Sequence, residues 1–229
     1  MRTYAQYCPI SRSLEVLGDR WTLLIIRDMH IGARRFNEIA RGLPGISRAL
    51  LARRLRQLAA AGLVRRTDDG YEMTRAAEDL RPLVMSLADW GARYAFGEPR
   101  PEELDPDLLM WWMHGGIDTS EVTQRTVVAI DLTDHRRTFW LVIEPGDASV
   151  CHTDPGFAVD AVLSSDVSTL YQVWEAKIDL LDALRSGRVS VDGPRWVIRG
   201  LAQWLQSSPV APYVRAIRAE AVTHAAGEA

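Results

Sequence analysis

Apolar residues recur at spacings of three and four along the N-terminal part of the chain, which is the period of α-helices. Glycine and proline interrupt the runs and mark where each helix ends. The pattern predicts helices over residues 9–17, 21–31, 35–41 and 47–61. A further helix follows from Thr74, and its apolar stripe extends to Tyr94. Pro82 either kinks this helix or marks its true start.

Two short strands are expected between these helices, over 63–67 and 71–73. Asp68-Asp69-Gly70 joins them, and Asp-Gly is typical of a tight hairpin. A hairpin directly after a helix pair is a wing, so the pattern predicts a mostly α-helical winged helix-turn-helix.

The pattern changes after a segment with three prolines, 97–106, which we interpret as a stiff linker. Beyond it, β-rich runs predict strands over 125–132, 138–143, 148–152, 158–163 and 189–193. Helices are expected around 107–113, 166–174, 178–184 and 194–205. We therefore expect an α+β domain with a mainly antiparallel five-stranded sheet and helices on one face. The predicted domains are 1–97 and 107–229, with the linker at 98–106.

The helix predicted from Ser47 has two distinct faces. Leu51, Leu55 and Leu58 form a buried stripe, and Ser47 is a good N-cap because its hydroxyl can accept from a free backbone N–H. Arginines occupy the opposite side. From Arg34 to Arg66 there are nine arginines and one acid, Glu38. A single helix of this kind would be interpreted as a surface helix with solvated arginines. A cluster with so many arginines and one acid repels itself, so it indicates a polyanionic binding partner such as nucleic acid.

Charge divides the chain in the same place as the pattern does. Residues 1–97 carry 16 Lys and Arg against 10 Asp and Glu, and residues 98–229 carry 11 against 20. The two cysteines are too few for a disulfide scaffold, and neither a leader sequence nor a long apolar run is evident. We expect a cytoplasmic protein without a membrane segment, a metal or a cofactor.

Several motifs follow one another in order over about 7–95. They include Cys8-Pro9, Gly18-Asp-Arg-Trp-Thr-Leu-Leu, Arg35-Phe-Asn-Glu-Ile, Leu43-Pro-Gly-Ile-Ser and Gly62-Leu-Val, and Tyr71, Thr74 and Trp90 extend the set. Together they resemble the HxlR-type winged helix-turn-helix regulators. The resemblance implies homodimers that bind pseudo-palindromic operators, with dimer contacts from the first and last helices. The wing is shorter than is usual in that family, and Ala77 stands where glycine is common.

This resemblance implies that the helix from Ser47 enters the major groove of double-stranded DNA. Ser47, Arg48, Ala49 and Arg53 are then the candidates for base edges and adjacent phosphates. The remaining candidates would mainly hold phosphates; they are Arg34, Arg35, Arg41, Arg54, Arg56 and Arg66. Arg54 has an alternative role, in which it braces the fold.

Cys8 lies at the start of the first predicted helix, where the helix dipole lowers the pKa of a thiol. The resemblance adds that some family members sense oxidants or electrophiles through a cysteine in this place. The alternative is a cysteine packed under the dimer interface.

Residues from about Val159 to Leu205 resemble the sterol-carrier lipid-transfer module, through a strand, a Ser-Asp helix start and the run Leu-Arg-Ser-Gly-Arg-Val-Ser-Val-Asp-Gly-Pro. The resemblance implies a cavity for an apolar small-molecule effector. Six tryptophans are candidates to line it or, alternatively, are ordinary core: Trp111, Trp112, Trp140, Trp174, Trp196 and Trp204.

No enzyme signature is evident, since the chain lacks a nucleophile elbow, a P-loop and a dinucleotide fingerprint. The sequence therefore favours a dimeric DNA-binding transcriptional regulator whose C-terminal domain senses an apolar molecule. Two alternatives stay open. The C-terminal domain is a lipid-like carrier or enzyme localised by the basic domain, or it is only a docking and oligomerisation surface.

Overall fold

The computed structural model describes residues 3–227, with side chains described as far as residue 221. The chain forms two compact units, Met1–Leu87 and Ala88–Ala229. The boundary between them falls inside a long helix, ahead of the proline-rich segment.

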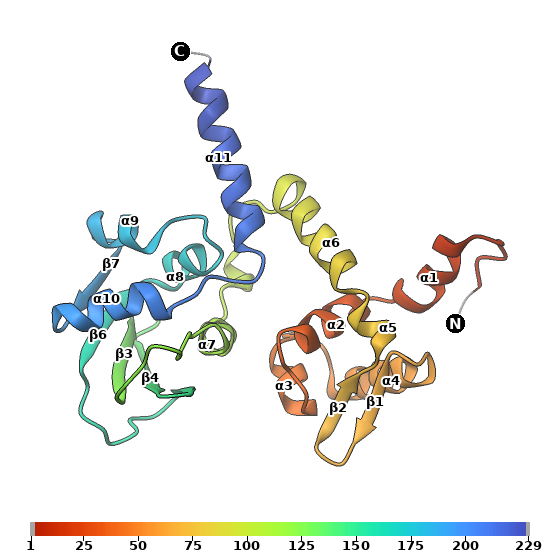
Figure 1. The fold of residues 1–229 in the computed structure, drawn as a ribbon, viewed down its shortest axis with the longest axis horizontal. Helices are drawn as coiled ribbons and strands as arrows, with labels where there is room; N and C mark the ends of the chain where they lie inside the picture. Colours follow the sequence, from red (N-terminus) through yellow and green to blue (C-terminus); the bar gives the residue numbers. More distant parts are fainter. Residues whose placement is uncertain (1–2, 228–229) are drawn as a thin grey trace. The chain divides into compact units, whose positions relative to one another are not determined.

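The first unit is helical apart from one hairpin (Figure 1). Its elements are α1 (Pro9–Leu17), α2 (Thr22–His30), α3 (Phe36–Arg41), α4 (Arg48–Ala60), β1 (Val64–Thr67), β2 (Gly70–Met73), α5 (Arg75–Glu78) and the start of α6 (Arg81–Tyr94). Each predicted element of this unit is present. Pro82 is the second residue of α6, so it marks the start of that helix rather than a kink.

Local sequence explains both ends of α4. The Ser47 hydroxyl accepts a hydrogen bond from the Leu50 N–H at 3.2 Å, as its position predicts. Gly62 follows the helix with a φ of 72°, and the Leu63 N–H donates back to the Leu58 carbonyl at 2.9 Å. Only glycine adopts this left-handed conformation without strain, so the chain can leave the helix sharply and enter β1.

The second unit combines helices with one five-stranded sheet. Beyond the end of α6 its elements are a 3-10 turn (Pro101–Glu103), α7 (Pro106–Gly115), β3 (Thr126–Leu132), β4 (Arg137–Glu144), β5 (Asp147–Cys151), β6 (Ala161–Ser165), α8 (Val167–Trp174), α9 (Leu180–Arg185), β7 (Val189–Asp192), α10 (Arg195–Trp204) and α11 (Ala211–Gly227).

The strand order is β5-β4-β3-β6-β7, and the sheet is mostly antiparallel, as predicted, but it also contains one parallel pair that was not predicted. Strand β6 pairs with β3 in parallel, with Val128 opposite Ala161, while the other pairs are antiparallel. The physical reason is the connection after β5, which carries the chain past β4 and β3 to the far side of the sheet. Asp160 holds it there, because its backbone N–H and its carboxylate bond the Val127 C=O and N–H, both at 2.8 Å.

One face of the sheet carries the core of this unit. Ile130, Phe139 and Leu163 lie in neighbouring strands on that face and are at most 2% exposed. Helices α7, α8, α9 and α10 all contribute buried side chains to the same cluster. This agrees with the expectation that the helices collect on one side, since successive strand residues point to opposite faces.

Two details of the second unit were not predicted correctly. Strand β6 begins at Ala161 and continues to Ser165, whereas the sequence pattern placed a strand at 158–163. Helix α11 was not predicted at all. Among its described side chains, up to residue 221, only Ala211 and Val214 are buried, and both lie in the first turn. The sequence of the helix has no clear apolar stripe.

Candidate nucleic-acid interface

Helix α4 presents an arginine-bearing face outward. Leu51, Leu55 and Leu58 are at most 3% exposed and pack into the core of the first unit. Ala49, Arg53 and Arg56 lie on the opposite side at spacings of four and three, and all are exposed. Within the described part of the chain, the Arg53 and Arg56 guanidinium groups have no hydrogen-bond or ion-pair partner. Their charges are therefore available to an external anion.

The first turn of α4 is held against α3 by Arg48. Its guanidinium donates to the Asn37 side-chain oxygen at 2.8 Å and lies 5.0 Å from the centre of the Phe36 ring. Arg48 remains exposed, so it both braces the two helices and faces solvent. The role of Phe36 and Asn37 in this contact was not evident from the sequence.

Arg54 faces a different way from Arg53. Its side chain is only 11% exposed, and its guanidinium is bound by the Asp19 carboxylate and by the Gln57 side-chain oxygen. Asp19 lies in the segment between α1 and α2, so this ion pair ties α4 to that segment. The placement fits the bracing role that the sequence left open, rather than a phosphate contact.

The loop between α2 and α3 is organised by Arg34 and Glu38. The Arg34 guanidinium donates to the Met29 carbonyl at 2.5 Å, close to the C-terminus of α2. The Glu38 carboxylate accepts from the backbone N–H groups of Arg34 and Arg35, both at 2.9 Å. Partial burial opposes ionisation, but these bonds prevail and lower the pKa of Glu38. Arg34, Arg35 and Arg41 are all exposed.

The wing packs against this loop through backbone contacts. The Tyr71 N–H donates to the Arg34 carbonyl at 2.9 Å. Gly70 has a φ of 147°, and a Cβ there would lie 2.5 Å from the same carbonyl oxygen. A glycine is therefore required both by conformation and by space. The wing is fixed relative to α3, which was not evident from the sequence.

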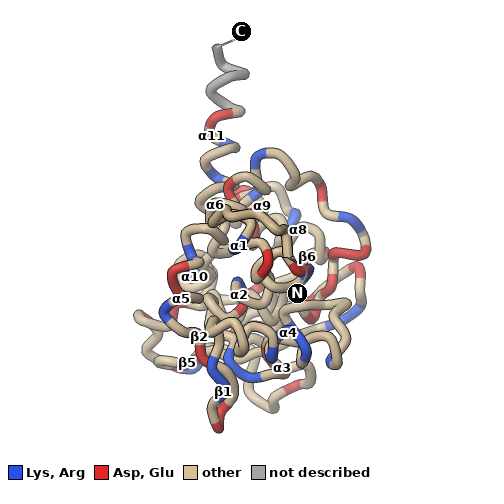
Figure 2. The backbone as a smooth tube through the Cα atoms, turned by 90° about the vertical axis from the view of Figure 1, so that its right-hand side faces the viewer, with Lys and Arg blue, Asp and Glu red and all other residues tan. Residues whose placement is uncertain are grey.

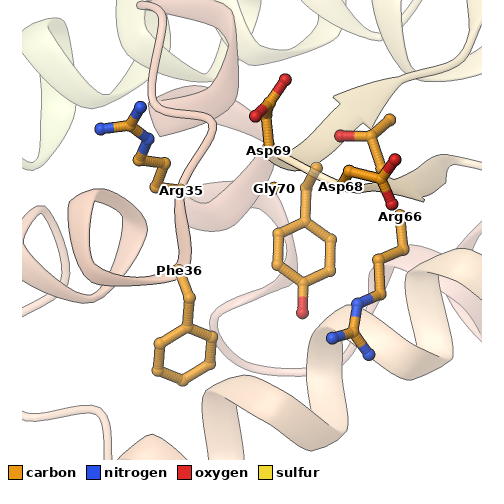
Figure 3. Close-up of a pocket in the computed structure, with 8 residues that line it drawn as sticks. Arg35, Phe36, Arg66, Asp68, Asp69 and Gly70 are labelled. Atoms are coloured by element: carbon orange, nitrogen blue, oxygen red, sulfur yellow. The ribbon is translucent and has the colours of Figure 1, made fainter.

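A cleft of about 310 Å³ lies between the wing and the start of α3 (Figure 3). Its lining residues are Arg35, Phe36, Arg66, Thr67, Asp68, Asp69, Gly70 and Tyr71. In Figure 3 the Phe36 and Arg66 side chains point to one side of the cleft, and Arg35 and Asp69 point to the other. Arg66 is exposed and, among the described residues, has no ion-pair partner.

Asp28 is a buried charge that the sequence analysis did not identify. It is 1% exposed, its Oδ1 pairs with the Arg27 guanidinium at 2.7 Å, and no described residue gives its Oδ2 a hydrogen bond. Burial raises the pKa of Asp28 to about 6, although Arg27 opposes the shift. Oδ2 lies against Gly42 at the end of α3, where a Cβ would come within 2.2 Å. The only sequence signal was an acidic residue within an apolar helix.

Cys8 is the N-cap residue of α1 and is half-buried. The Ser11 and Ile10 backbone N–H groups at the start of α1, together with the Ser11 side chain, lower the pKa of its thiol. Cys151 lies in β5, opposite Trp140 of β4.

The six candidate tryptophans do not share one environment. Trp174 and Trp204 belong to the buried cluster, and Trp112 is half-buried against it, edge-on to Tyr171. Trp196 is 43% exposed and contacts the Trp204 ring edge-on. Trp111 is half-buried on α7. Trp140 alternates with Phe139 and Leu141, so it lies on the opposite face of the sheet from Trp174 and cannot line the same cavity.

Neither a membrane span nor a metal cluster is found among the described residues. No helix there has both the length and the apolar character to cross a bilayer. No three His, Cys, Asp or Glu side chains in this part of the chain gather closely enough to hold a metal ion.

Basic residues gather around α3, α4 and strand β1 (Figure 2). A helix pair supported by a third helix and followed by a two-stranded wing defines the first unit as a winged helix-turn-helix, a class of DNA-binding domain. The chain belongs to the HxlR-like helix-turn-helix family, whose model matches residues 16–98. Residues 119–206 match a second family, the SCP-2 sterol transfer family.

Curated relatives resemble the N-terminal part of the chain. An uncharacterized HTH-type transcriptional regulator of Mycobacterium tuberculosis, Rv3095, is 42% identical over 100 residues, which cover 41% of this chain and 61% of the relative. The uncharacterized HTH-type transcriptional regulator YkvN of Bacillus subtilis is 31% identical, over 44% of this chain and 95% of its own. This chain therefore spans about three fifths of the mycobacterial protein and nearly all of YkvN.

A solved structure also resembles this chain over a similar share of its length. The reduced form of the B. subtilis transcriptional regulator YodB is 31% identical, covers 39% of this chain and 99% of its own, and has a TM-score of 0.36.

Proposed function

We propose that the protein is a dimeric transcriptional regulator that binds double-stranded DNA sequence-specifically through α4 and senses an apolar small molecule through its second unit. One observation carries the DNA-binding part. The outward face of α4 holds Arg53 and Arg56, which have no hydrogen-bond or ion-pair partner among the described residues, directly opposite three buried leucines. A helix fixed in this way can insert its charged face into the major groove.

The candidate residues then divide into three roles. Ser47, Arg48, Ala49 and Arg53 lie on the first two turns of α4 and would reach base edges and nearby phosphates. A second group would hold phosphates; it consists of Arg34, Arg35, Arg41, Arg56 and Arg66. Arg54 would act indirectly, by fixing α4 against the segment that holds Asp19.

Exposed apolar stripes on α1 and α6 support a dimer. Leu87, Trp90 and Tyr94 follow one another at spacings of three and four on α6 and are 47%, 59% and 69% exposed. On α1, Ile10 is 70% exposed and Leu14 is 45% exposed. Contiguous apolar stripes of this kind are usually covered by a partner, and a second copy would place two α4 helices on one DNA site.

The second unit supplies the proposed effector site. Its match to the SCP-2 sterol transfer family supports an apolar ligand, held between the helices and the core face of the sheet. Trp112, Trp174 and Trp204 lie on that side and would report binding by their fluorescence, with Trp196 at the rim. Thermodynamic linkage requires that an effector which weakens DNA binding is itself bound more weakly in the presence of DNA.

Selection from a pool of random duplexes tests the DNA-binding function. The full chain is expected to enrich a two-fold related pair of half-sites spaced by about one helical turn. Arg53→Ala should reduce the enrichment at the base position that it contacts, while Arg199→Ala, an exposed arginine of the second unit, serves as the matched control. A pool that stays random after repeated selection would contradict the proposal.

Fluorescence titration with fatty acids and sterols, with and without the selected duplex, tests the effector function. We expect tryptophan quenching and a Kd that differs between the two conditions. A ligand that binds with the same Kd in both conditions would favour a carrier instead.

We further propose that Cys8 senses oxidants or electrophiles, because its position as the N-cap residue of α1, beside the backbone N–H groups of Ile10 and Ser11, lowers the pKa of its thiol. Mass spectrometry after mild peroxide treatment should find the adduct on Cys8 before Cys151, together with altered DNA affinity. An unmodified Cys8, or a modified Cys8 with unchanged affinity, would leave only a packing role.

A further inference from the structure

The tip of the wing differs in charge from the rest of the candidate DNA-binding surface. Asp68 and Asp69 form the turn between β1 and β2, where Thr67 pairs with Gly70. Both carboxylates are exposed, and neither has a hydrogen-bond or ion-pair partner among the described residues. Figure 2 shows the acidic tip at the far end of the hairpin, beyond the basic segments of β1, α3 and α4.

The tip is held in place by the rest of the unit. Tyr71 and Gly70 dock the hairpin on the Arg34 carbonyl, so the wing has a fixed position relative to α3. Nearer its base, Arg65 pairs with Glu72 across the strands at 2.5 Å, and the two charges offset each other. The neighbouring Arg66 keeps its charge available. The wing therefore carries positive charge at its base and negative charge at its tip.

This distribution matters because DNA presents phosphates on both sides of its narrow minor groove. A tip with two carboxylates is repelled there, whereas a cationic tip would be attracted by any sequence. We propose that Asp68 and Asp69 act as specificity-determining residues, which keep the wing tip away from the phosphates and so lower the affinity for DNA of every sequence. Discrimination between DNA sequences then depends on the contacts of α4 with the bases. This inference rests on the proposed DNA-binding function.

The variant Asp68→Asn/Asp69→Asn tests the inference, because asparagine suits the same turn positions and removes only the charges. The probe is a 30-base-pair duplex of mixed sequence, and the readout is fluorescence anisotropy with the full chain from 50 to 200 mM salt. We expect affinity to rise about tenfold at 0.1 M salt. The slope of log K against log salt should steepen by about 1 to 2.

The control variant is Glu121→Gln/Asp192→Asn, which makes the same change in net charge at two exposed residues of the second unit. It should leave the affinity and the slope close to those of the wild type. Equal or weaker binding by the wing variant, relative to the wild type, overturns the inference and leaves the proposed function intact. A wild type and a wing variant that both fail to bind any duplex overturn the proposed function and the inference together.

Discussion

Arg53 and Arg54 are adjacent in sequence but have opposite environments. Arg53 lies on the exposed face of α4 and has no partner in the part of the chain that the structure describes, while Arg54 is 11% exposed and bound to Asp19 and Gln57. A turn of about 100° per residue separates the two directions. The difference predicts that one arginine acts on DNA and the other on stability.

Replacing Arg54 should therefore destabilise the first unit. Arg54→Ala leaves Asp19 without its partner and is expected to cost about 2 kcal/mol in free energy of unfolding. At temperatures where the variant is folded, the salt dependence of its DNA binding should stay that of the wild type. Thermal unfolding and a salt titration measure the two effects separately. A variant of normal stability with a shallower salt slope would instead make Arg54 a phosphate contact.

Asp28 predicts a pH effect. Its pKa in the folded protein is about 6, above the 3.8 expected in the unfolded chain, so folding favours the protonated form. This contribution to stability is fully present below pH ~4 and is lost as pH rises towards 6, by about 3 kcal/mol in total.

In Asp28→Asn that loss is absent. The stability of the variant relative to the wild type should therefore increase between pH 4 and pH 7. Hydrogen exchange of the α2 amides measures the difference in the first unit. A constant difference across this range would show that Asp28 titrates normally.

At the scale of elements, α6 carries the clearest unpartnered surface. Trp90 is 59% exposed in the middle of an apolar stripe, so Trp90→Glu places a charge where a partner subunit would lie. We expect the variant to be monomeric at concentrations where the wild type is a dimer, as measured by sedimentation. Asp89→Asn, a change of charge at the adjacent residue, is the matched control. A dimeric Trp90→Glu protein would exclude this stripe as the interface.

The sequence predicted elements best where apolar spacing and end signals agree. The α4 boundaries follow from Ser47, the three leucines and Gly62, all of which act locally. The parallel pairing of β6 with β3 could not be predicted in this way, because it depends on contacts between residues far apart in sequence. Helix α11 gives too weak an apolar pattern to detect.

Some features of the candidate site were evident from the sequence, as for the elements of the fold, and others were not. The arginine cluster was evident from composition, and its outward face on α4 from the leucine spacing. The bracing of Arg54 by Asp19 and the buried Asp28 depend on tertiary packing, which the sequence pattern does not reveal. The six tryptophans looked equivalent in sequence, yet strand alternation separates Trp140 from Trp174.

At the scale of the whole molecule, the family matches divide the chain as its charge does. The HxlR-like match lies in the basic part, and the SCP-2 match lies in the acidic part. In the proposed function, the first unit would bind DNA and the second an apolar molecule, so that the level of this molecule would change transcription.

The salt dependence of binding to double-stranded DNA tests the central claim most directly. For the wild type, log K should fall linearly with log salt. In Arg53→Ala/Arg56→Ala the slope should be shallower by about 2, because roughly 0.9 is lost for each phosphate contact removed. Equal slopes for the wild type and this variant, or no salt-dependent affinity at all, would contradict the assignment of α4 as the DNA-binding helix.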